Sequence, residues 1–209
     1  MTTKKYQTEQ ENFWAGSFGN EYMERNRDPL LVSSNIHLFS EIIACTKDVH
    51  SIFEVGANIG LNIDALNQLC PEKTTSSLEL NTEAFSTLKN KCTGEAYQGS
   101  VLDLNPSELP TFDFTFTKGV LIHIHPDKLP LVYEKLYQLS SKYLCIIEYY
   151  NPTPVEVEYR GFRNKLFKRD FAGEILTAYQ DLKLVNYGFK YHKDNNFPIG
   201  DVTWFLLKK

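Results

Sequence analysis

The stretch that decides the fold is Ser51-Ile-Phe-Glu-Val-Gly-Ala-Asn-Ile-Gly-Leu-Asn62. It begins with β-branched and aromatic residues typical of a buried strand, continues through a Gly-x-x-x-Gly turn, and leads into a helical pattern. Gly56 lets the backbone turn sharply and lets a ligand come close, because glycine has no Cβ atom. Gly60 stands where the new helix packs against the sheet. The stretch therefore predicts the strand–turn–helix opening of an α/β domain.

The rest of the chain repeats this alternation of short apolar runs and helical periodicity. Strands are expected at residues 51–55, 75–80, 96–99, 112–118, 143–149, 183–189 and 203–207, and helices at residues 38–45, 60–69, 82–91, 126–141 and 170–178. The last two strands are joined by residues 192–201, a polar connection without helical pattern, so they are expected to pair antiparallel. The sequence predicts one α/β, Rossmann-like domain over residues 1–209. Its sheet is expected to have seven strands, mostly parallel with one antiparallel strand, and helices on both faces.

Two segments fall outside the alternation and are expected to be irregular. They are residues 13–34, near the N-terminus, and residues 151–169, after the fifth strand. Long irregular segments in a compact domain are usually lids or binding loops. We therefore expect an N-terminal lid or cap segment within residues 1–37 and a substrate-loop insertion at residues 151–169, both closing over the carboxyl edge of the sheet.

The composition excludes several classes of protein. The 209 residues are 42% hydrophobic and 23% charged, close to globular averages, which argues against a disordered or fibrous chain. No apolar run approaches the roughly 18 residues that span a bilayer. The polar N-terminal sequence shows no secretory signal, so the cytoplasm is the expected compartment and no membrane partner is expected. The formal net charge of -4 argues against a basic surface that follows nucleic-acid phosphates.

Polar residues at successive strand ends indicate which ligand the carboxyl edge binds. The pattern G-x-G-x-x-G would need glycines where Asn58 and Leu61 stand, so a dinucleotide cofactor is disfavoured. Glu54, at the end of the first strand, can help neutralise the ammonium of S-adenosylmethionine (SAM). Glu79 ends the second strand, where a carboxylate can accept both ribose hydroxyls, and residues 98–103 follow the third, where an adenine edge would lie. In this order, these residues predict a SAM site.

This organisation resembles the class I SAM-dependent methyltransferases, and the resemblance covers most of the chain. The family's first motif is usually written Glu/Asp-x-Gly-x-Gly-x-Gly, and here Asn58 stands at the middle glycine. Asn adopts a left-handed backbone more readily than most residues. The resemblance implies a class I methyltransferase fold, with SAM as cofactor and S-adenosylhomocysteine (SAH) as product. The cofactor-binding residues it implies are Trp14, Tyr22, Arg25, Glu54, Gly56, Ala57, Asn58, Gly60, Glu79, Leu80, Asn81, Ser100, Val101, Leu102, Lys118 and Gly119.

Longer segments are more specific than a glycine motif. The first is Asn12-Phe-Trp-Ala-Gly-Ser-Phe-Gly-Asn-Glu-Tyr-Met-Glu-Arg-Asn26. The others are residues 119–129, 149–154, 159–161 and 166–171. These segments resemble the pseudaminic-acid-biosynthesis-associated methylases, a resemblance that associates the chain with acidic nine-carbon sugars.

The aromatic residues Trp14, Phe18 and Tyr22 lie in a Gly-containing segment ahead of the first expected helix. Their rings either anchor this segment on the core or touch the sulfonium or adenine of SAM, with a cation–π attraction of about 0.5–2 kcal/mol. Arg25 either pairs with the SAM carboxylate through a bidentate contact or forms a surface ion pair.

Two histidines follow the fourth strand, at the edge where this architecture binds ligands. Methyl transfer is an in-line displacement, so the protein has to align the nucleophile and, for a hydroxyl or ammonium, remove its proton. A histidine with a pKa near neutrality suits that task, although a histidine here is often structural. The catalytic candidates are His123, ahead of the others, His125 and Tyr149, with Glu148 and Tyr150 as alternatives.

Residues 151–169 concentrate basic side chains in an otherwise acidic protein. The cluster is either a solvated face or a clamp for an anion such as a carboxylate or phosphate, for which Arg is geometrically suited. A nucleic-acid partner is disfavoured because no extended basic stripe accompanies the cluster. The substrate-binding candidates are Tyr150, Tyr159, Arg160, Arg163, Lys168 and Arg169.

The sequence thus predicts a SAM-dependent methyltransferase that moves a methyl group to oxygen or nitrogen of a small anionic acceptor. The best candidate acceptor is a nonulosonic sugar acid of the pseudaminic or legionaminic type, or its nucleotide-linked form. The alternatives are a methyltransferase for another small molecule (an amino acid, a phosphonate or a natural product), an RNA methyltransferase, and a non-catalytic SAM-binding module. No spacing of His and Cys predicts a metal site, and nothing in the sequence indicates the oligomeric state.

Overall fold

The computed structural model describes residues 6–26 and 28–209. The helices are α1 (Glu9–Ala15), α2 (Ser17–Arg25), α3 (Pro29–Ile43), α4 (Leu61–Leu69), α5 (Thr82–Leu88), α6 (Leu129–Leu139) and α7 (Phe171–Ala178). The strands are β1 (Ser51–Val55), β2 (Thr74–Glu79), β3 (Ala96–Gln98), β4 (Phe112–Lys118), β5 (Ser140–Glu148), β6 (Val155–Tyr159), β7 (Phe162–Lys168), β8 (Lys183–Lys190) and β9 (Val202–Lys208). Short 3-10 turns cover Pro106–Glu108, Leu121–His123 and Pro126–Lys128. Within the described ranges, no helix has both the length and the apolar character needed to cross a bilayer.

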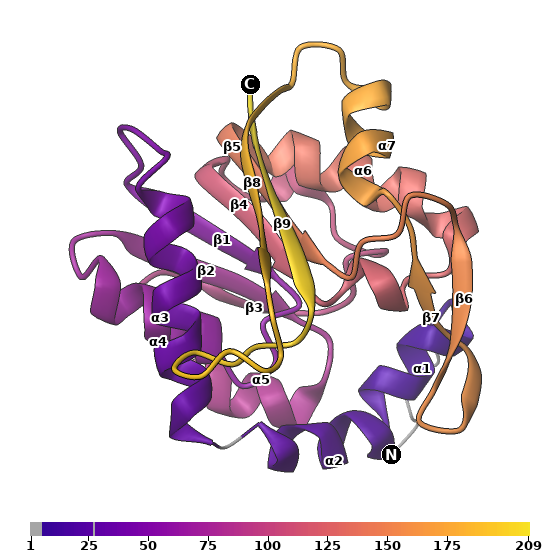
Figure 1. Ribbon diagram of the computed structural model, residues 1–209. Helices are drawn as coiled ribbons and strands as arrows, with labels where there is room; N and C mark the ends of the chain where they lie inside the picture. The colour runs from indigo at the N-terminus through magenta and orange to yellow at the C-terminus, as the bar shows by residue number, and fades with distance from the viewer. Residues whose placement is uncertain (1–5, 27) are drawn as a thin grey trace.

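Seven strands form one sheet in the order β3-β2-β1-β4-β5-β9-β8 (Figure 1). Strands β1 to β5 pair parallel, whereas β9 pairs antiparallel with both β5 and β8. The predicted seven-stranded, mostly parallel sheet with one antiparallel strand is therefore confirmed. The strand order reverses direction between β1 and β4, and open α/β sheets bind ligands in the crevice beyond the strand ends at such a switch point.

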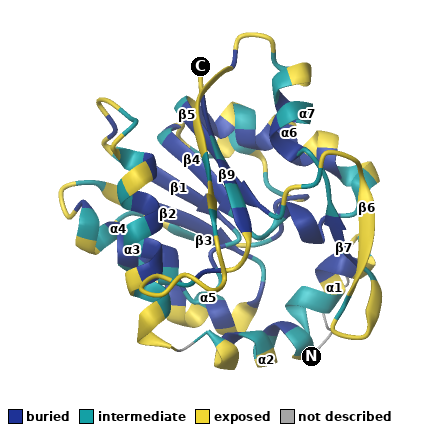
Figure 2. Cartoon of the chain, in the orientation of Figure 1, coloured by how far each residue is buried: buried dark blue, intermediate teal, exposed yellow. Residues whose placement is uncertain are grey.

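Helices cover both faces of the sheet and bury it (Figure 2). Ile52 and Phe53 are consecutive residues of β1, and their side chains join opposite hydrophobic clusters because strand side chains alternate between faces. Ile52 lies in the cluster that contains Phe39 of α3 and Leu66 of α4. Phe53 lies in the cluster that contains Val132 of α6. The central strands are therefore apolar on both sides, as the sequence indicated.

The N-terminal segment is helical, so the expectation of an irregular stretch at residues 13–34 is wrong. The Thr8 side chain accepts a hydrogen bond from the backbone N–H of Glu11, and the Glu11 side chain accepts one from that of Thr8, which starts α1 with a capping box. The Asp28 side chain caps α3, whose first residue is Pro29, a favoured residue at that position. Apolar periodicity alone placed the start of this helix at residue 38 because it ignored these caps.

Residues 151–169 are not irregular either, since they contain the antiparallel hairpin of β6 and β7. Its two-residue turn consists of Arg160 and Gly161, with φ angles of +52° and +85°. Two positive φ angles give the turn the twist that hairpin strands require. Such turns usually contain Asn-Gly, Asp-Gly or Gly-Gly. Here an arginine replaces the first of these residues, so only Gly161 indicates a turn in the sequence.

The helices α1 and α2 run along the bottom of Figure 1 and lie beside this hairpin. The Gln10 side-chain amide donates to the Asn164 carbonyl at 2.9 Å, and the Lys165 ammonium pairs with Glu9. The two segments that the sequence set apart therefore contact each other.

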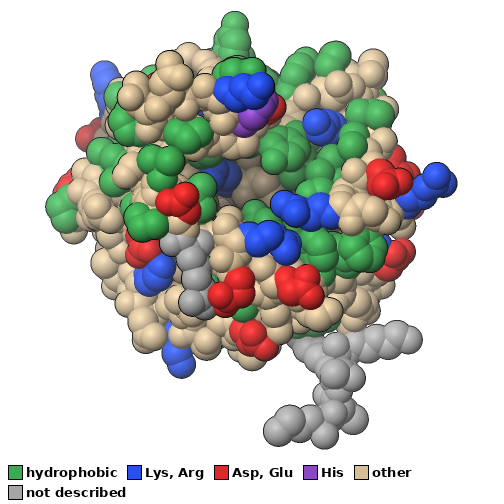
Figure 3. All heavy atoms as spheres, turned by 60° about the horizontal axis from the view of Figure 1, so that its bottom comes forward, with side chains coloured by type: hydrophobic (Ala, Val, Ile, Leu, Met, Phe, Trp, Pro, Cys, Tyr) green, Lys and Arg blue, Asp and Glu red, His purple; other side chains and the backbone are tan. Residues whose placement is uncertain are grey.

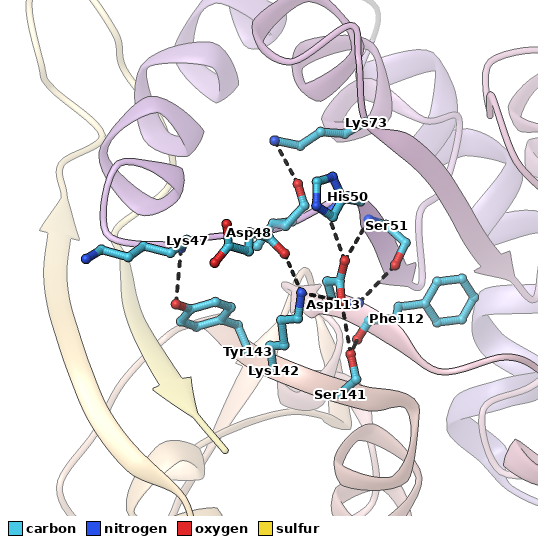
Figure 4. Close-up of polar contacts among 11 residues, drawn as sticks. Lys47, Asp48, His50, Ser51, Lys73, Phe112, Asp113, Ser141, Lys142 and Tyr143 are labelled. Carbon is cyan, nitrogen blue, oxygen red and sulfur yellow. Dashed lines mark hydrogen bonds and ion pairs between the residues drawn. The ribbon is translucent and has the colours of Figure 1, made fainter.

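At the amino-terminal ends of the parallel strands, Asp113 links the starts of three of them (Figure 4). Its carboxylate accepts hydrogen bonds from the backbone N–H groups of His50 at 2.9 Å and Ser51 at 3.4 Å. It also accepts one from the Ser141 hydroxyl at 3.3 Å and pairs with the Lys142 ammonium at 3.1 Å. One carboxylate thus connects β1, β4 and β5.

Candidate functional site

A cavity opens at the carboxyl ends of β1, β2 and β4, at the switch point of the sheet. The strand ends and the turns that follow them form its base, and residues of α1, α2 and α3 line it as well. Figure 3 views the molecule from the side of α1 and α2 and shows a hollow at its centre. We call the space lined by these elements the central cavity.

The turn after β1 takes a left-handed backbone at three positions. The φ angles are +78° at Gly56, +49° at Asn58 and +80° at Gly60. A Cβ atom on Gly56 would lie 2.5 Å from a methyl group of Val120, so only glycine fits there. Asn58 adopts the left-handed backbone that Asn takes more readily than most residues, and its backbone N–H donates to Glu79 at 2.6 Å. Asn at this position is therefore compatible with the turn.

Glu79 ends β2 and lines the central cavity. One carboxylate oxygen accepts from the Asn58 N–H and the other from the Asn81 N–H, each at 2.6 Å. Burial raises the pKa of Glu79, although these backbone hydrogen bonds favour its charged form. The arrangement fixes the carboxylate at the cavity wall, and two carboxylate oxygens have four lone-pair sites in all.

Glu54 is fully buried and does not itself line the cavity. It accepts a hydrogen bond at 2.5 Å from the Asn62 amide, and Asn62 lines the cavity. Burial raises the pKa of Glu54 to about 8. In the described part of the chain, Glu54 Oε2 and Asn62 Oδ1 are buried without a hydrogen-bond partner. Because buried polar atoms are almost always paired, these two oxygens indicate that a donor is to be bound here.

Lys118 ends β4 and is the one Lys or Arg side chain, among the residues that the structure describes, that lines the central cavity. Its ammonium donates to the Asn35 side chain at 3.0 Å. Burial lowers the pKa of Lys118 to about 8, although the carboxylates of Glu54 and Glu148 favour its charged form. An ammonium has three donors, so two remain for a ligand.

Glu148 organises the loop that follows β4. Its carboxylate accepts from the backbone N–H groups of Val120 at 2.9 Å and Leu121 at 3.0 Å. Burial raises the pKa of Glu148 to about 7. This carboxylate supports the 3-10 turn that carries His123 and does not line the cavity.

His123 is buried and lines the central cavity. Its Nδ1 lies 2.6 Å from the carbonyl oxygen of Lys165, and a carbonyl only accepts, so Nδ1 carries the proton and Nε2 keeps a lone pair. The ring packs against those of Trp14 and Tyr159, with centroids 4.5 and 5.0 Å away. Burial lowers the pKa of His123 to about 4, so the imidazole is neutral at physiological pH.

The other catalytic candidates lie outside the central cavity. His125 is partly exposed and caps the following 3-10 turn by accepting from the Asp127 N–H at 3.3 Å. Tyr149 is half-buried beneath the Lys168 ammonium, which lies 5.1 Å from the ring centroid. Tyr150 is exposed and lies beside Phe205. Of the candidates, the structure brings only His123 into the cavity wall.

Most of the predicted cofactor-binding residues line the central cavity. They are Trp14, Tyr22, Gly56, Ala57, Asn58, Glu79, Leu80, Asn81, Ser100, Val101, Lys118 and Gly119. Four do not. Glu54 lies behind Asn62, and Gly60 directly precedes α4, where a Cβ atom would meet Leu88 at 2.9 Å. Leu102 packs in the core, and Arg25 lines a separate surface cleft.

The predicted substrate-binding residues are dispersed. Tyr159 packs on Trp14 and His123, and Arg160 lines the same surface cleft as Arg25. Arg169 is paired with Glu174 at 2.6 Å. None of the predicted basic residues of the hairpin, Arg160, Arg163, Lys168 and Arg169, lines the central cavity.

Several residues of the cavity wall carry no individual signal in the sequence. From the lid helices these are Gln10, Glu11, Gly19, Asn26, Leu31 and Asn35, and from the sheet side Val55, Ile59, Leu61, Asn62, Leu78, Gly99, Val120, Ile124 and Ile199. Asn62, eight residues after Glu54 at the start of a helix, is the one that spacing from the glycine turn could have found. In the described residues, Trp14 Nε1 and Glu11 Oε1 are also buried without a hydrogen-bond partner.

Comparisons with known proteins identify the fold. No protein-family model matches the chain, and no curated protein matches its sequence. Among solved structures, a SAM-dependent methyltransferase from Leishmania major is similar over 97% of this chain and 87% of its own, with 15% identity and a TM-score of 0.70.

Two further solved structures carry the cofactor or its product. A 1,6-didemethyltoxoflavin-N1-methyltransferase from Burkholderia thailandensis, with its acceptor and SAH bound, is similar over 95% of this chain and 86% of its own (12% identity, TM-score 0.68). An amino pentose methyltransferase from Micromonospora echinaspora, with SAM bound, is similar over 91% and 95% (11% identity, TM-score 0.59). The chain thus has the Rossmann-like fold of the class I SAM-dependent methyltransferases.

Proposed function

We propose that this protein is a SAM-dependent methyltransferase that acts on oxygen or nitrogen of a small molecule. The observation that carries the proposal is that two acceptors line the cavity around the glycine turn. One is the fixed carboxylate of Glu79, and the other is the amide oxygen of Asn62, which has no hydrogen-bond partner in the described part of the chain. A nucleoside that also bears an amino-acid chain needs both groups. It needs acceptors for two ribose hydroxyls and an acceptor for an ammonium.

The cavity wall fits each part of this cofactor. Glu79 would accept from the ribose hydroxyls, and Ser100 and Val101 would lie at the adenine edge. Asn62 Oδ1 would accept from the ammonium, with Glu54 behind it. Lys118 would pair with the carboxylate, since no other Lys or Arg in the described part of the chain lines this cavity. Arg25, the sequence-based candidate for that role, lies in another cleft.

The protein's own contribution to transfer is position and a hydrogen-bond acceptor. When bound, SAM supplies an electrophilic methyl group on a sulfonium. The Nε2 lone pair of His123 would accept the hydroxyl or amine hydrogen of the acceptor and aim its nucleophilic atom. A pKa near 4 makes His123 a weak base, but a hydroxyl oxygen that gains a methyl group becomes a strongly acidic oxonium and gives up its proton easily. An amine nitrogen that gains a methyl group becomes an ammonium, whose proton passes to water. Trp14 and Tyr22 would exclude water above it.

A nonulosonic sugar acid, or its nucleotide-linked form, is the acceptor we propose. It is supported by the sequence resemblance to the pseudaminic-acid-associated methylases. A methyltransferase for another small molecule is the second candidate. It is supported by the similar fold of enzymes for an amino pentose and for a didemethyltoxoflavin.

Calorimetric titration with SAH tests the proposed function. We expect wild-type protein to bind SAH and Glu79→Ala to bind it at least about tenfold more weakly, a loss of about 1.4 kcal/mol. Glu95→Ala is the matched control, because Glu95 is an exposed carboxylate beside the start of β3. Thermal unfolding of each variant shows whether it is folded. Wild-type protein that gives no heat with SAH or SAM would overturn the proposal.

Metabolite mass spectrometry tests the acceptor. Extracts of cells with and without the protein should differ by a species 14 daltons heavier, whose unmethylated partner accumulates when the protein is missing. If that species is not a nonulosonic acid or its nucleotide-linked form, the second candidate replaces the first.

A further inference from the structure

A second cleft lies on the surface between the lid helices and the β6–β7 hairpin. Aromatic side chains of Phe13, Phe18 and Phe162 line it, together with the two guanidinium groups of Arg25 and Arg160. The carboxylate of Glu21 lines it as well. We call this space the outer cleft.

The two arginines of the outer cleft are held against rings and lack an acidic partner. The Arg25 guanidinium lies 5.2 Å from the ring of Phe18 and 5.5 Å from that of Tyr22. The Arg160 guanidinium lies 5.9 Å from the ring of Tyr159. Within residues 6–26 and 28–209, neither forms an ion pair with an Asp or Glu.

Two other basic side chains of the hairpin region are paired with acids. Lys165 pairs with Glu9, and Arg169 pairs with Glu174. Arg25 and Arg160 are therefore cations that line the outer cleft and whose hydrogen-bonding edges remain for a ligand. Rings that hold a guanidinium plane in place reduce the conformational entropy lost when it binds an anion.

A chain of aromatic contacts joins the outer cleft to the central cavity. The rings of Phe18 and Tyr159 are 5.8 Å apart, and the ring of Tyr159 is 5.0 Å from that of His123. Two ring contacts therefore separate the cleft from the side chain that we propose aims the nucleophile. Figure 3 shows Lys and Arg side chains on the rim of the hollow on this face.

We propose that the outer cleft binds an oxyanion group of the acceptor, a phosphate or a carboxylate, through Arg25 and Arg160. This inference rests on the proposed function, since it describes the far end of the molecule that is methylated in the central cavity. Guanidinium groups donate paired hydrogen bonds that match the oxygens of phosphate and carboxylate. The acceptor then carries its negative charge at a distance from its nucleophilic atom, and Arg25 contacts the acceptor rather than the cofactor.

Nuclear magnetic resonance of the arginine Nε–H groups tests this site in the full-length protein with inorganic phosphate and with acetate as probes. Sodium chloride at equal ionic strength corrects for screening. We expect the signals of Arg25 and Arg160 to shift saturably with phosphate, acetate or both, and the tighter probe identifies the kind of oxyanion. Arg25→Gln and Arg160→Gln should each weaken binding at least about tenfold.

Arg163→Gln is the matched control, because Arg163 lies on the same hairpin and lines neither cavity. Its anion affinity should stay within about twofold of wild type. An equal loss in all three variants would reduce the effect to general surface charge and overturn the inference. A weakened SAH affinity in Arg25→Gln would also overturn it, by assigning Arg25 to the cofactor. Wild-type protein that binds the anions but not SAH would instead count against the proposed function alone.

Discussion

At the scale of single residues, Lys118 and Arg25 are two cations that the sequence assigned to the same cofactor. Folding places the first in the wall of the central cavity and the second in the outer cleft. A cation in a largely buried wall interacts with a ligand charge through a lower dielectric than an exposed one does. We therefore expect Lys118 to be the better partner for the carboxylate at the amino-acid end of the proposed cofactor.

Comparing SAH with 5′-methylthioadenosine, which lacks the amino-acid chain, isolates this contact. We expect Lys118→Met to weaken SAH binding at least about tenfold while it changes the affinity for 5′-methylthioadenosine little. Arg25→Gln should leave the difference between the two ligands as in wild type. Calorimetry on the three proteins measures both affinities. An equal loss for both ligands in Lys118→Met would mean that the lysine supports the fold of the cavity rather than the carboxylate.

His123→Asn separates the aiming role of the histidine from its packing. The Asn amide can still donate to the Lys165 carbonyl, as Nδ1 does, but it lacks the Nε2 lone pair. We expect methyl transfer to fall about 10²–10⁴-fold, with SAH affinity unchanged. Labelled SAM with a cell extract that supplies the acceptor measures this rate. His125→Asn should retain the wild-type rate, because His125 lies outside the central cavity. Full activity in His123→Asn would remove His123 from the mechanism.

The lowered pKa of His123 also sets a pH dependence. Its folded pKa of about 4 lies below the unfolded value of about 6.5, so the folded state binds fewer protons between these values. The stability this group contributes is fully present above pH 6.5 and is lost as the pH falls toward 4. Urea unfolding from pH 7 to pH 4.5 should show wild type losing more stability than His123→Asn. Parallel curves for the two proteins would contradict the buried neutral imidazole.

At the scale of elements, Asp113 is the side chain that links the starts of β1, β4 and β5 (Figure 4). Burial works against its charged form, but hydrogen bonds from the His50 N–H and from Lys142 outweigh it and lower the pKa of Asp113. The stabilisation is therefore present above the unfolded pKa of about 3.9 and is lost as the pH falls through the lowered value.

Replacing this carboxylate should destabilise the sheet. We expect Asp113→Asn to lower the free energy of unfolding by about 1–3 kcal/mol near pH 7, because the amide loses the ion pair and part of the hydrogen bonding. Urea denaturation measures the change. Asp127→Asn is the control, because the Asp127 side chain is 86% exposed. Equal midpoints for wild type and Asp113→Asn would show that Asp113 contributes nothing to linking the strands.

At the scale of the whole molecule, Asn81, just after the end of β2, holds the lid over the central cavity. The Asn81 amide donates to the Trp14 carbonyl at 3.1 Å and to the Asn20 side chain at 2.7 Å. Trp14 Nε1 and Glu11 Oε1, which have no hydrogen-bond partner among residues 6–26 and 28–209, lie on the same helix. A ligand in the central cavity would add contacts beneath α1 and α2.

Hydrogen exchange should detect this closure. On addition of SAH, we expect amides of α1 and α2 to become more protected, whereas those of β8, far from the cavity lining, should change little. Mass spectrometry of peptic fragments resolves these segments. Unchanged exchange in α1 and α2, with SAH bound, would show that the lid does not respond to the cofactor.

The strand–turn–helix at residues 51–62 and the mostly parallel seven-stranded sheet could be predicted from the sequence, because alternation, glycine positions and an acid at a strand tip are local patterns. The helices of the lid could not be placed by apolar periodicity, because their starts depend on side-chain caps at Thr8 and Asp28. The hairpin was missed because Arg160 has a positive φ angle, which an arginine in a sequence does not indicate.

The sequence by itself determined the α/β fold, the glycine turn and the position of Glu79 at the ligand-binding edge of the sheet. Only the tertiary structure decided that His123 lines the cavity while His125 does not, that Lys118 rather than Arg25 is the cavity's cation, and that Asn62 stands between Glu54 and the ligand space. The physical reason is the distance along the chain over which each property is determined. Fold class follows from patterns a few residues long, whereas burial, pKa and free hydrogen-bonding capacity depend on which distant segments pack around a side chain.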